Sequence, residues 1–560
     1  MTSLTIRAAL GAALLTTGVD AASVQEPEPA ESQLLSLLVA QTDDPDVRFL
    51  CLIFLSLDDH RELAAEVPQP LYVAALVSKL SSQSSFDEDL RAELVSLCTA
   101  WEKAERGNGF PMLIRANAAL QDGELDEGLL LLEQASLRTY VDDWNARSLA
   151  ARWTTLNEHG IEDVACFPAI LQRNLGLTNQ LIDAALVLSL HGDECRHRGR
   201  LAEAQRCDGI LERLGSKYES RCTDWVAGLT AEFVSGLAAW GALETSLMRG
   251  DAEAAKRAAA LGDASLQRTE VYELAKERAE AVDPLYKAAA ELDFGIGEFL
   301  GGLWGGLVRA ASEEEEAADR QLDQRAKSGL ARLLKRASRD QLALESRLRA
   351  NEAEVRAHFE ALVRDGELGL FLSYLTEEEH AEVSQLRSMQ RHLYELREEF
   401  YPSVYGEEHR QGLVERILSD PEELPVEQQD LASYLRGVAI RALIHHGDRD
   451  ARPLLRSGFD ELDGLRAADV ALVLSCLGAG DASLAEPLLE WVGIFSLAGY
   501  RGVACLGKRE LVKPLLETLG EYPDVDEGIA AAFALADLTG EDFGLDFDRW
   551  RRWADEHLGD

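Results

Sequence analysis

A glycine followed five residues later by a second small residue recurs four times between about residues 110 and 265. The pairs are Gly123 with Gly128, Gly160 with Ala165, Gly199 with Ala204, and Gly250 with Ala255. The first glycines are separated by 37, 39 and 51 residues, with helical periodicity on both sides. Glycine permits the tight turn between two helices, and the small residue lets the second helix approach the first. The pattern therefore predicts a series of helical hairpins.

The composition supports helices throughout the chain. Ala and Leu dominate, and runs of Val, Ile and Thr that are typical of strands are scarce. The chain has 560 residues, of which 46% are apolar, so it can bury a large core as several domains or as one repeat array. We therefore predict an all-α fold.

One of the predicted hairpins resembles a known repeat family. The segment LSLHGDECRHRGRLAEAQRC (188–207) is similar to a tetratricopeptide hairpin, with Gly192 and Ala204 on that family's small positions. Its large aromatic positions fit less well, and the spacing exceeds the usual period of about 34 residues. The resemblance implies degenerate tetratricopeptide-like hairpins.

A second rhythm appears near both ends of the chain. DDPDVRFLCLIFLSL (43–57) has an Asp cap and Pro45 at the first helical position, and this opening resembles a helix of a HEAT repeat. Pro-Leu-Leu recurs at Pro453, Pro487 and Pro514, with spacings of 34 and 27 residues. Proline can start a helix because its missing N–H is not needed there. AIRALIHHGDRDARPLL, which leads into the first of these, is similar to bacterial HEAT repeats.

The last residues are rich in aromatic side chains. AAFALADLTGEDFGLDFDRWRRWADEH (531–557) resembles the terminal segment of many bacterial HEAT-repeat proteins. A stack of helix pairs ends in an exposed apolar face that a terminal unit has to cover. Trp550 and Trp553 are three residues apart and share one helical face. We expect Phe543, Phe547, Trp550 and Trp553 to form a structural cap.

The middle of the chain differs from both repeat regions. Phe294–Val308 is apolar and rich in glycine, and a charged helix is predicted from Ala317 to Arg364 with an apolar seam that includes Leu348, Val355 and Leu362. From Arg320 to Arg349, nine basic and three acidic residues give a local charge of +6. This pattern favours a helical hairpin or short coiled coil, whose basic face either pairs with the chain's own acidic surface or meets an anionic membrane.

These observations predict an all-α helical-repeat solenoid of HEAT-like and tetratricopeptide-like units, interrupted by a long helical hairpin or coiled coil. The predicted parts are a signal peptide (1–21), a linker (22–32), HEAT-like helices (33–105), tetratricopeptide-like hairpins (106–290), the Gly-rich segment and long hairpin (291–400), a linker (401–424), and HEAT-like repeats with the aromatic cap (425–560).

The N-terminus predicts export. Arg7 precedes a short apolar run from Ala8 to Val19, and Val19-Asp20-Ala21 offers small residues at a cleavage site. The alternative is a frayed amphipathic N-terminus. A periplasmic, cell-envelope or secreted location follows from the first interpretation. The formal charge of −43 argues against a general nucleic-acid binder and fits solubility, an atmosphere of divalent cations or a basic partner.

The cysteines offer one candidate disulfide. Cys195 lies four residues before Gly199 and Cys207 eight after it, so they could face each other across a hairpin. Three interpretations stay open: a disulfide, two buried free thiols, or a metal site that draws on HGDECRH (191–197). Zinc sites usually use close cysteine pairs, which this cluster lacks.

Other candidate ligands have simpler explanations. Glu377 with His380, and His392 with Glu395, have the spacing used in di-iron bundles, but a solvated helix face accounts for them. His445 and His446 precede Gly447 and Asp448, and this arrangement is typical of a turn. The sequence contains no nucleophile elbow, phosphate loop or His-Glu-x-x-His motif. We therefore predict no catalytic, cofactor or metal residue.

Repeat arrays present extended concave surfaces. The leading hypothesis is accordingly an exported, non-enzymatic scaffold that binds a protein or peptide partner. The alternative is an envelope protein that meets a membrane surface through residues 294–349. A helical metalloenzyme around Glu377 and His380 is the third hypothesis, and the oligomeric state stays open.

Overall fold

The computed structural model describes residues 30–558, except for 42, 51–56, 67–68, 82–87, 172–174, 284–342, 344, 460–461, 463, 479–481, 493–496 and 520–524. Within these ranges every regular element is a helix, and an isolated bridge joins Asn108 to Tyr140. The predicted all-α fold is therefore confirmed. The predicted signal peptide (1–21), most of the linker after it, and the segment Phe294–Val308 lie outside the described residues.

The N-terminal helices are short and mostly pack on their neighbours in chain order. They are α2 (Ala30–Ala40), α3 (Pro45–Leu50), α4 (Leu57–Glu66), α5 (Pro70–Ser81), α6 (Glu88–Ala104), α7 (Phe110–Gln121), α8 (Leu125–Leu137), α9 (Asn145–Glu158) and the 3₁₀ helix η3 (Val164–Leu171). Pro45 is the first residue of α3, as predicted. The carboxylate of Asp44 caps this helix by accepting from the main-chain N–H of Asp46 and Val47.

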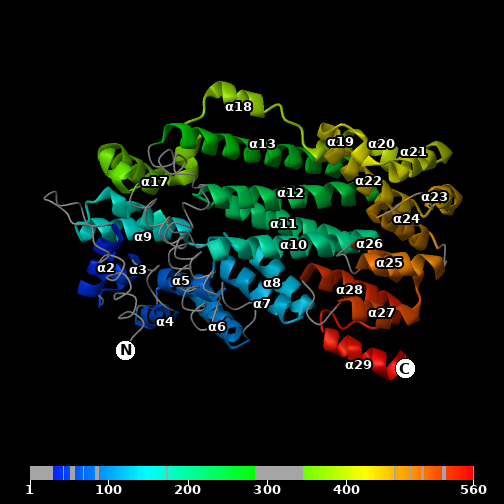
Figure 1. Cartoon of the computed structure of the whole chain (residues 1–560), viewed down its shortest axis with the longest axis horizontal. Coiled ribbons are helices and arrows are strands. Elements are labelled where there is room, and N and C mark those ends of the chain that lie inside the picture. Colours follow the sequence, from blue (N-terminus) through cyan, green and yellow to red (C-terminus); the bar gives the residue numbers. More distant parts are fainter. Residues whose placement is uncertain are drawn as a thin grey trace, which may run out of the picture.

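Four long helices cross the middle of the molecule side by side (Figure 1). They are α10 (Leu175–His197), α11 (Leu201–Glu219), α12 (Trp225–Met248) and α13 (Ala252–Val282), and each packs on the next. Asp224 caps α12 by accepting from the N–H of Ala227, and Asp251 caps α13 by accepting from the N–H of Ala254. These caps satisfy N–H groups that the first turn of each helix leaves unpaired.

The glycines of the predicted pattern lie in turns, after α7, α9, α10 and α12. Gly123, Gly160, Gly199 and Gly250 have φ angles of 86°, 64°, 69° and 71°, in the left-handed region that favours glycine. A side chain at Gly128, the first small partner, would come within 2.6 Å of Leu120 on the preceding helix. All four glycines therefore adopt the turn conformation, although Gly160 is followed by the 3₁₀ helix η3 and not by an α-helix.

The region after α13 corrects two predictions. The helix predicted from Ala317 to Arg364 is not continuous, because the chain leaves the helical conformation at Asn351 and α17 (Glu352–Leu372) begins anew. The seam residues Leu348, Val355 and Leu362 are nevertheless buried. The elements that follow are α18 (Glu377–Val383), α19 (Met389–Glu395), α20 (Arg397–Phe400) and α21 (Glu407–Leu418). Residues 401–424 thus include a packed helix, since α21 buries Leu413, Val414 and Ile417 and contacts α22 (Val426–His446).

The C-terminal part consists of short helices, several of them preceded by a 3₁₀ turn. They are η4 (Pro421–Glu423), α22 (Val426–His446), η5 (Arg449–Ala451), α23 (Arg452–Phe459), α24 (Gly464–Cys476), η6 (Ala482–Leu484), α25 (Ala485–Val492), α26 (Leu497–Leu506), η7 (Arg509–Leu511), α27 (Val512–Leu519), α28 (Val525–Thr539) and α29 (Phe547–Leu558). Pro453, Pro487 and Pro514 lie in the first turns of α23, α25 and α27, where no N–H is required.

The aromatic residues of the C-terminus lie together. Phe547, Trp550 and Trp553 on α29 are buried in the same core cluster as the leucines of α27. The ring of Phe543 is 4.6 Å from that of Trp550, whose indole N–H donates to the main-chain oxygen of Gly544. Helix α29 packs on α27, and its aromatic side chains belong to the core there.

The C-terminal helices do not simply extend the row of hairpins. Helix α28 packs against α10, and α10 also contacts α5, α7 and α22. In Figure 1 the C-terminal helices α27 to α29 accordingly lie beside the N-terminal half of the chain. Gly544 approaches the main-chain oxygen of Gly123 in the turn between α7 and α8. Helix α10 is therefore the element around which both halves of the chain meet.

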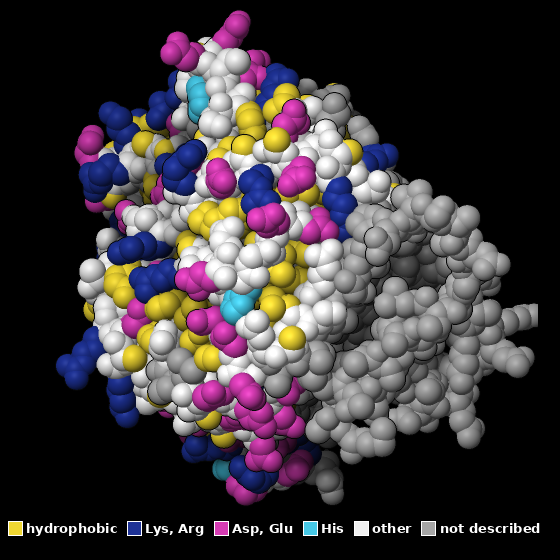
Figure 2. Space-filling model, turned by 90° about the vertical axis from the view of Figure 1, so that its left-hand side faces the viewer, with side chains coloured by type: hydrophobic (Ala, Val, Ile, Leu, Met, Phe, Trp, Pro, Cys, Tyr) yellow, Lys and Arg dark blue, Asp and Glu magenta, His cyan; other side chains and the backbone are white. Residues whose placement is uncertain are grey.

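The surface and the most apolar helix fit a well-packed body. In the described part of the chain, α12 is the helix long and apolar enough to cross a membrane, with a mean hydropathy of 1.4. Most of it is buried between α11 and α13, as in a core helix. On the end of the molecule that carries α2, α9 and α17, basic and acidic side chains separate the hydrophobic ones (Figure 2).

Candidate functional site

A groove with a volume of about 1430 Å³ opens between the central and C-terminal helices. We call it the central groove. Its walls come from α10, α12 and α13 on one side and from α19, α22, α26 and α28 on the other. The lining includes Leu186, Asp193, Arg196, Glu232, Phe233, Trp240, Glu273, Arg387, Met389, Tyr434, Arg441, Tyr500 and Glu527. Segments far apart in the sequence therefore build one concave surface.

The walls of the central groove expose large apolar side chains. Phe233 is 42% exposed, Met389 42% and Leu186 38%, although most apolar residues of these helices are buried. Trp240 packs edge-on against Tyr434, with 4.2 Å between the ring centroids. Apolar side chains that converge on a concave surface are typical of binding sites. A ligand in this groove would gain by removing these side chains from water.

The groove also holds a buried carboxylate with unused hydrogen-bonding capacity. Glu232 on α12 is 1% exposed. Its Oε1 accepts from the guanidinium of Arg268 on α13 at 2.5 Å, whereas its Oε2 has no hydrogen-bond partner among the described residues. Burial raises the pKa of this carboxyl, and the neighbouring Arg268 opposes that shift. Buried polar atoms are rarely left unpaired, so Oε2 is suited to accept a hydrogen bond from a ligand.

Some residues of the groove lining take part in buried ion pairs. The guanidinium of Arg196 on α10 donates to Asp208 on α11 at 3.0 Å, and the hydroxyl of Thr245 on α12 donates to the same carboxylate at 2.9 Å. A side chain at Gly241 would lie 2.0 Å from Asp208, so the pair fits only because this position lacks a Cβ. Three helices are thereby joined by one buried charge pair.

Arginines from the C-terminal part form further buried ion pairs with α10 and α12. Arg441 on α22 pairs with Glu244 on α12, and Arg501 on α26 donates to Glu194 on α10 at 2.6 Å and also pairs with Asp193. Burial alone would raise the pKa of Asp193, but the surrounding arginines, Arg501 first, hold it well below its ordinary value. The contact between the two halves of the chain is thus strongly charged.

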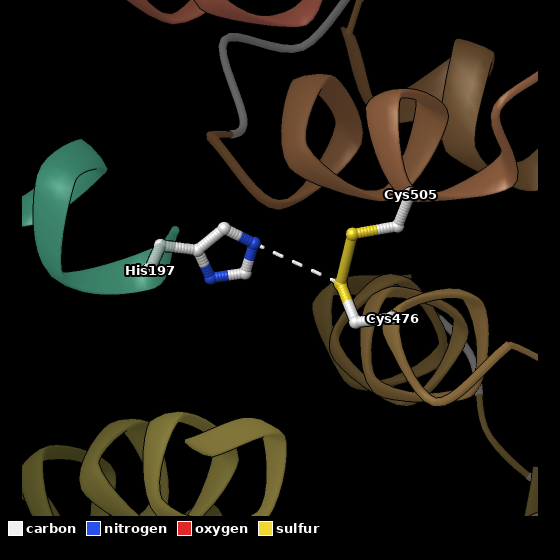
Figure 3. Close-up of side chains that lie close together, drawn as sticks. All are labelled: His197, Cys476 and Cys505. Atoms are coloured by element: carbon white, nitrogen blue, oxygen red, sulfur yellow. Dashed lines mark hydrogen bonds between the residues drawn. A yellow bond between two sulfur atoms is a disulfide. The ribbon is translucent and has the colours of Figure 1, made fainter. Parts of the chain in front are cut away.

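A histidine and a disulfide meet at one end of α10 (Figure 3). Cys476 and Cys505 form a disulfide with 4.9 Å between the Cα atoms, and Nε2 of His197 lies 3.7 Å from Sγ of Cys476. Burial, with Arg501 and Arg198 nearby, lowers the pKa of His197 to about 3, so its ring is neutral at neutral pH.

This arrangement corrects the disulfide prediction. Cys195 and Cys207 are buried free thiols, and burial raises the pKa of each to about 12. They face the same interior of the α10–α11 hairpin without being bonded. Of the three interpretations of this pair, the structure supports the free thiols. The cysteines that do pair lie on α24 and α26, which pack against each other.

Part of the cluster predicted from HGDECRH is assembled. The ligand atoms of His191, Cys195 and Glu203 all lie within 4.8 Å of one another. Burial lowers the pKa of His191 to about 4, and its Nδ1 has no hydrogen-bond partner among the described residues. Glu203, however, is paired with Arg200 at 3.0 Å.

The remaining candidate ligands serve structural contacts. Glu377 and His380 are exposed on α18 and lie in no cluster of metal-ligating residues in the described part of the chain. His392 contacts the main-chain oxygen of Ser388, one turn earlier, and Glu395 pairs with Arg391. His446 contacts the main-chain oxygen of Phe400.

The turn after α22 has the predicted chemistry. Gly447 has a φ of 62° at the end of the helix, and the carboxylate of Asp448 accepts from the N–H of Asp450. Both residues therefore act in the turn, as the sequence indicates.

Sequence reasoning missed the central residues of the groove. Glu232 and Glu244 are the two charged residues of α12, an otherwise apolar helix. Burying a carboxylate in such a helix is costly unless it is paired or binds a ligand. The two glutamates in this apolar helix could therefore have indicated a buried polar site. The partners Arg268, Arg441 and Arg501 come from distant segments and carry no local signal.

Comparisons with known proteins add no relative: no family model, curated protein or solved structure matches the chain.

Proposed function

We propose that the protein is a non-enzymatic helical scaffold that binds a basic segment of a partner protein in the central groove. The observation that carries the proposal is the buried carboxylate of Glu232, a residue of the groove lining whose Oε2 has no hydrogen-bond partner among the described residues. A carboxylate accepts hydrogen bonds only, so the matching group is an N–H, and a lysine or arginine side chain makes the strongest such bond.

The other charges of the groove support a basic ligand. Its arginines are already neutralised, since Arg196 pairs with Asp208, and Arg441 with Glu244. Glu273 lines the groove and has no ion-pair partner among the described residues. The net charge of −43 also steers basic segments toward the molecule.

The size and the apolar walls indicate a polypeptide segment. Pockets for small molecules have volumes of about 300–1,000 Å³, and the central groove exceeds this range at about 1430 Å³. Exposed Phe233 and Met389 provide contacts for apolar residues that flank a basic one. The protein is also proposed to be exported, and the disulfide between Cys476 and Cys505 supports this because such bonds persist in oxidising compartments.

A pair of labelled peptides tests the proposal by fluorescence anisotropy. In one peptide leucine alternates with lysine, and in the other leucine alternates with glutamate. We expect the lysine peptide to bind and Glu232→Gln to weaken it at least about tenfold, because the variant loses the charge that receives the lysine.

Glu253→Gln is the matched control. It makes the same charge change on an exposed residue in the first turn of α13, outside the groove. Affinity should stay within a factor of about two of wild type. Equal losses in the two variants would show that the peptide responds only to net charge and would refute the groove as its site.

A further inference from the structure

Three helix ends converge beside the charged contact between the two halves of the chain. His197 is the last residue of α10, Cys476 is the last residue of α24, and Cys505 lies one residue before the end of α26. Figure 3 shows the imidazole of His197 pointing toward the disulfide, with Nε2 directed at Sγ of Cys476. None of the three side chains is fully buried, so small reagents have access to them.

The spacing of the ligand atoms suits a metal ion. Nε2 of His197 and the two Sγ atoms all lie within 4.8 Å of one another, and Nε2 is 3.7 Å from Sγ of Cys476. With Zn–S bonds of about 2.3 Å and Zn–N bonds of about 2.0 Å, N and S ligands of a tetrahedral zinc ion are about 3.6 Å apart. The histidine therefore already stands at a suitable distance.

Reduction of the disulfide would supply the missing ligands. A dithiol reductant transfers two electrons and two protons to the cystine, so the S–S bond of Cys476 and Cys505 breaks and one forms in the reductant. When a zinc ion then binds, the two thiol protons pass to the solvent and two Zn–S bonds form. Rotation of the cysteine side chains separates the sulfur atoms to about 3.8 Å, the spacing of two thiolates on zinc.

We propose that the reduced protein binds one Zn²⁺ through Nε2 of His197 and the Sγ atoms of Cys476 and Cys505. Two thiolates and a neutral imidazole cancel the charge of the ion and leave a fourth position for water. The nearby Arg501 is held by Asp193 and Glu194, so it does not compete for the thiolates. In the oxidised protein the disulfide blocks the site.

This site does not depend on the proposed binding of a basic segment. It lies at the end of α10, one turn beyond Asp193 in the groove, and involves none of the groove-lining residues. Either proposal can therefore fail while the other holds.

A second cluster provides an internal control. His191, Cys195 and Glu203 also bring three ligand atoms within 4.8 Å of one another. This cluster has a single thiol, and its carboxylate is already engaged by Arg200. Zinc prefers sites with more thiolate ligands when these are accessible, so we expect the pair Cys476 and Cys505 to be occupied first.

The experiment is a metal titration of the full chain before and after reduction. The protein is treated with dithiothreitol, freed of it without oxygen, and titrated with Co²⁺ as a spectroscopic probe and then with Zn²⁺. We expect one ion per reduced chain, with a thiolate-to-cobalt absorption band, and no such band in the oxidised protein. His197→Ala should weaken Zn²⁺ binding by at least about a hundredfold, because a ligand matters more than a residue that only orients one.

Control variants test whether the ion binds at the proposed ligands. His191→Ala and Cys98→Ser should bind like wild type, and circular dichroism shows whether His197→Ala keeps its helices. Cys476→Ser, which prevents the disulfide, should lose the cobalt band under all conditions. The proposal is overturned if the reduced chain takes up no stoichiometric ion, if His197→Ala binds unchanged, or if the band disappears in His191→Ala instead.

Discussion

The central hairpins and the C-terminal helices are both all-helical, but they bury different side chains. Among the described residues from Gly464 to Leu558, the buried polar side chains are Ser475, Arg501 and Thr539. Helices α10 to α12 bury many more. These are Thr178, Glu194, Arg196, Asp208, Thr230, Glu232, Ser235, Glu244 and Thr245. Arg501, the buried charged residue among those described from Gly464 to Leu558, pairs with the carboxylate of Glu194 on α10.

This difference indicates that apolar burial and ion pairs contribute to the fold in different ways. Apolar faces stabilise each stack of helices by burial, but they tolerate small changes of register. A buried charge is costly unless its partner stands at the right place. We therefore infer that apolar packing builds the C-terminal stack, whereas the ion pairs determine how that stack meets α10 and shapes the central groove.

The largest loss of stability is expected when a charge is removed from the contact between α26 and α10. Arg501→Met leaves Asp193 and Glu194 buried beside fewer cations, and removal of one partner of a buried pair costs about 3–5 kcal/mol. Urea unfolding measures this loss. Arg449→Met, on an exposed residue of η5, should change stability by less than about 0.5 kcal/mol. If both variants unfold alike, the buried pairs do not hold the halves together.

In the C-terminal helices, we expect a variant that leaves a cavity in the apolar core to lower the stability. Leu535 on α28 is fully buried, and Leu535→Ala should cost about 2–4 kcal/mol through lost burial and the space left behind. Leu454→Ala, at a position 40% exposed, should cost less than about 1 kcal/mol. Equal costs at the two positions would argue against a close-packed C-terminal stack.

A smaller effect is expected from an added methyl group. Gly241→Ala would press a Cβ against the Asp208–Arg196 pair, and such overpacking costs about 1–3 kcal/mol. Gly412→Ala, in helix α21 with no atom within 4 Å of the added group, should instead gain about 0.5–1 kcal/mol. The opposite signs are the test, again by urea unfolding, and a gain in both variants would contradict the tight fit at Gly241.

A buried carboxyl beside the central hairpins should make the stability depend on pH. Asp143 accepts a hydrogen bond from the hydroxyl of Tyr218 on α11. Burial, with Asp224 nearby, raises the pKa of Asp143 from 3.8 to about 7. Between about pH 4 and pH 7 the folded chain keeps a proton that the unfolded chain releases, so this group lowers stability as the pH rises.

Asp143→Asn removes this titration. The variant should gain stability relative to wild type as the pH rises through that window, whereas the cost of Leu535→Ala should stay constant. Urea midpoints measured at several pH values check both statements. A constant difference between wild type and Asp143→Asn would show that Asp143 is ionised in the folded chain.

Much of the local structure could be predicted from the sequence. The glycines at 123, 160, 199 and 250 mark turns because their conformation is a local property, and Pro453, Pro487 and Pro514 mark first turns for the same reason. The break at Asn351 was missed because the apolar seam continues across it. Periodicity reports which face is buried, not whether the helix is continuous.

The candidate site could be predicted only in part. HGDECRH drew attention to the end of α10, where His197 does meet cysteines, and of the interpretations left open for Cys195 and Cys207 the structure supports two free thiols. Cys476 and Cys505 meet through the packing of α24 on α26, and Arg501 reaches α10 across more than 300 residues. Such contacts depend on how the C-terminal helices return to α10, and no local pattern carries that information.

Hydrogen exchange followed by mass spectrometry compares the two halves most directly. In Arg501→Met, the end of α10 and helix α26 should exchange faster than in wild type, while α27 to α29 keep wild-type protection because their apolar contacts are intact. Faster exchange spread evenly over all helices, or no change at α10, would contradict the claim that charges position the C-terminal stack without building it.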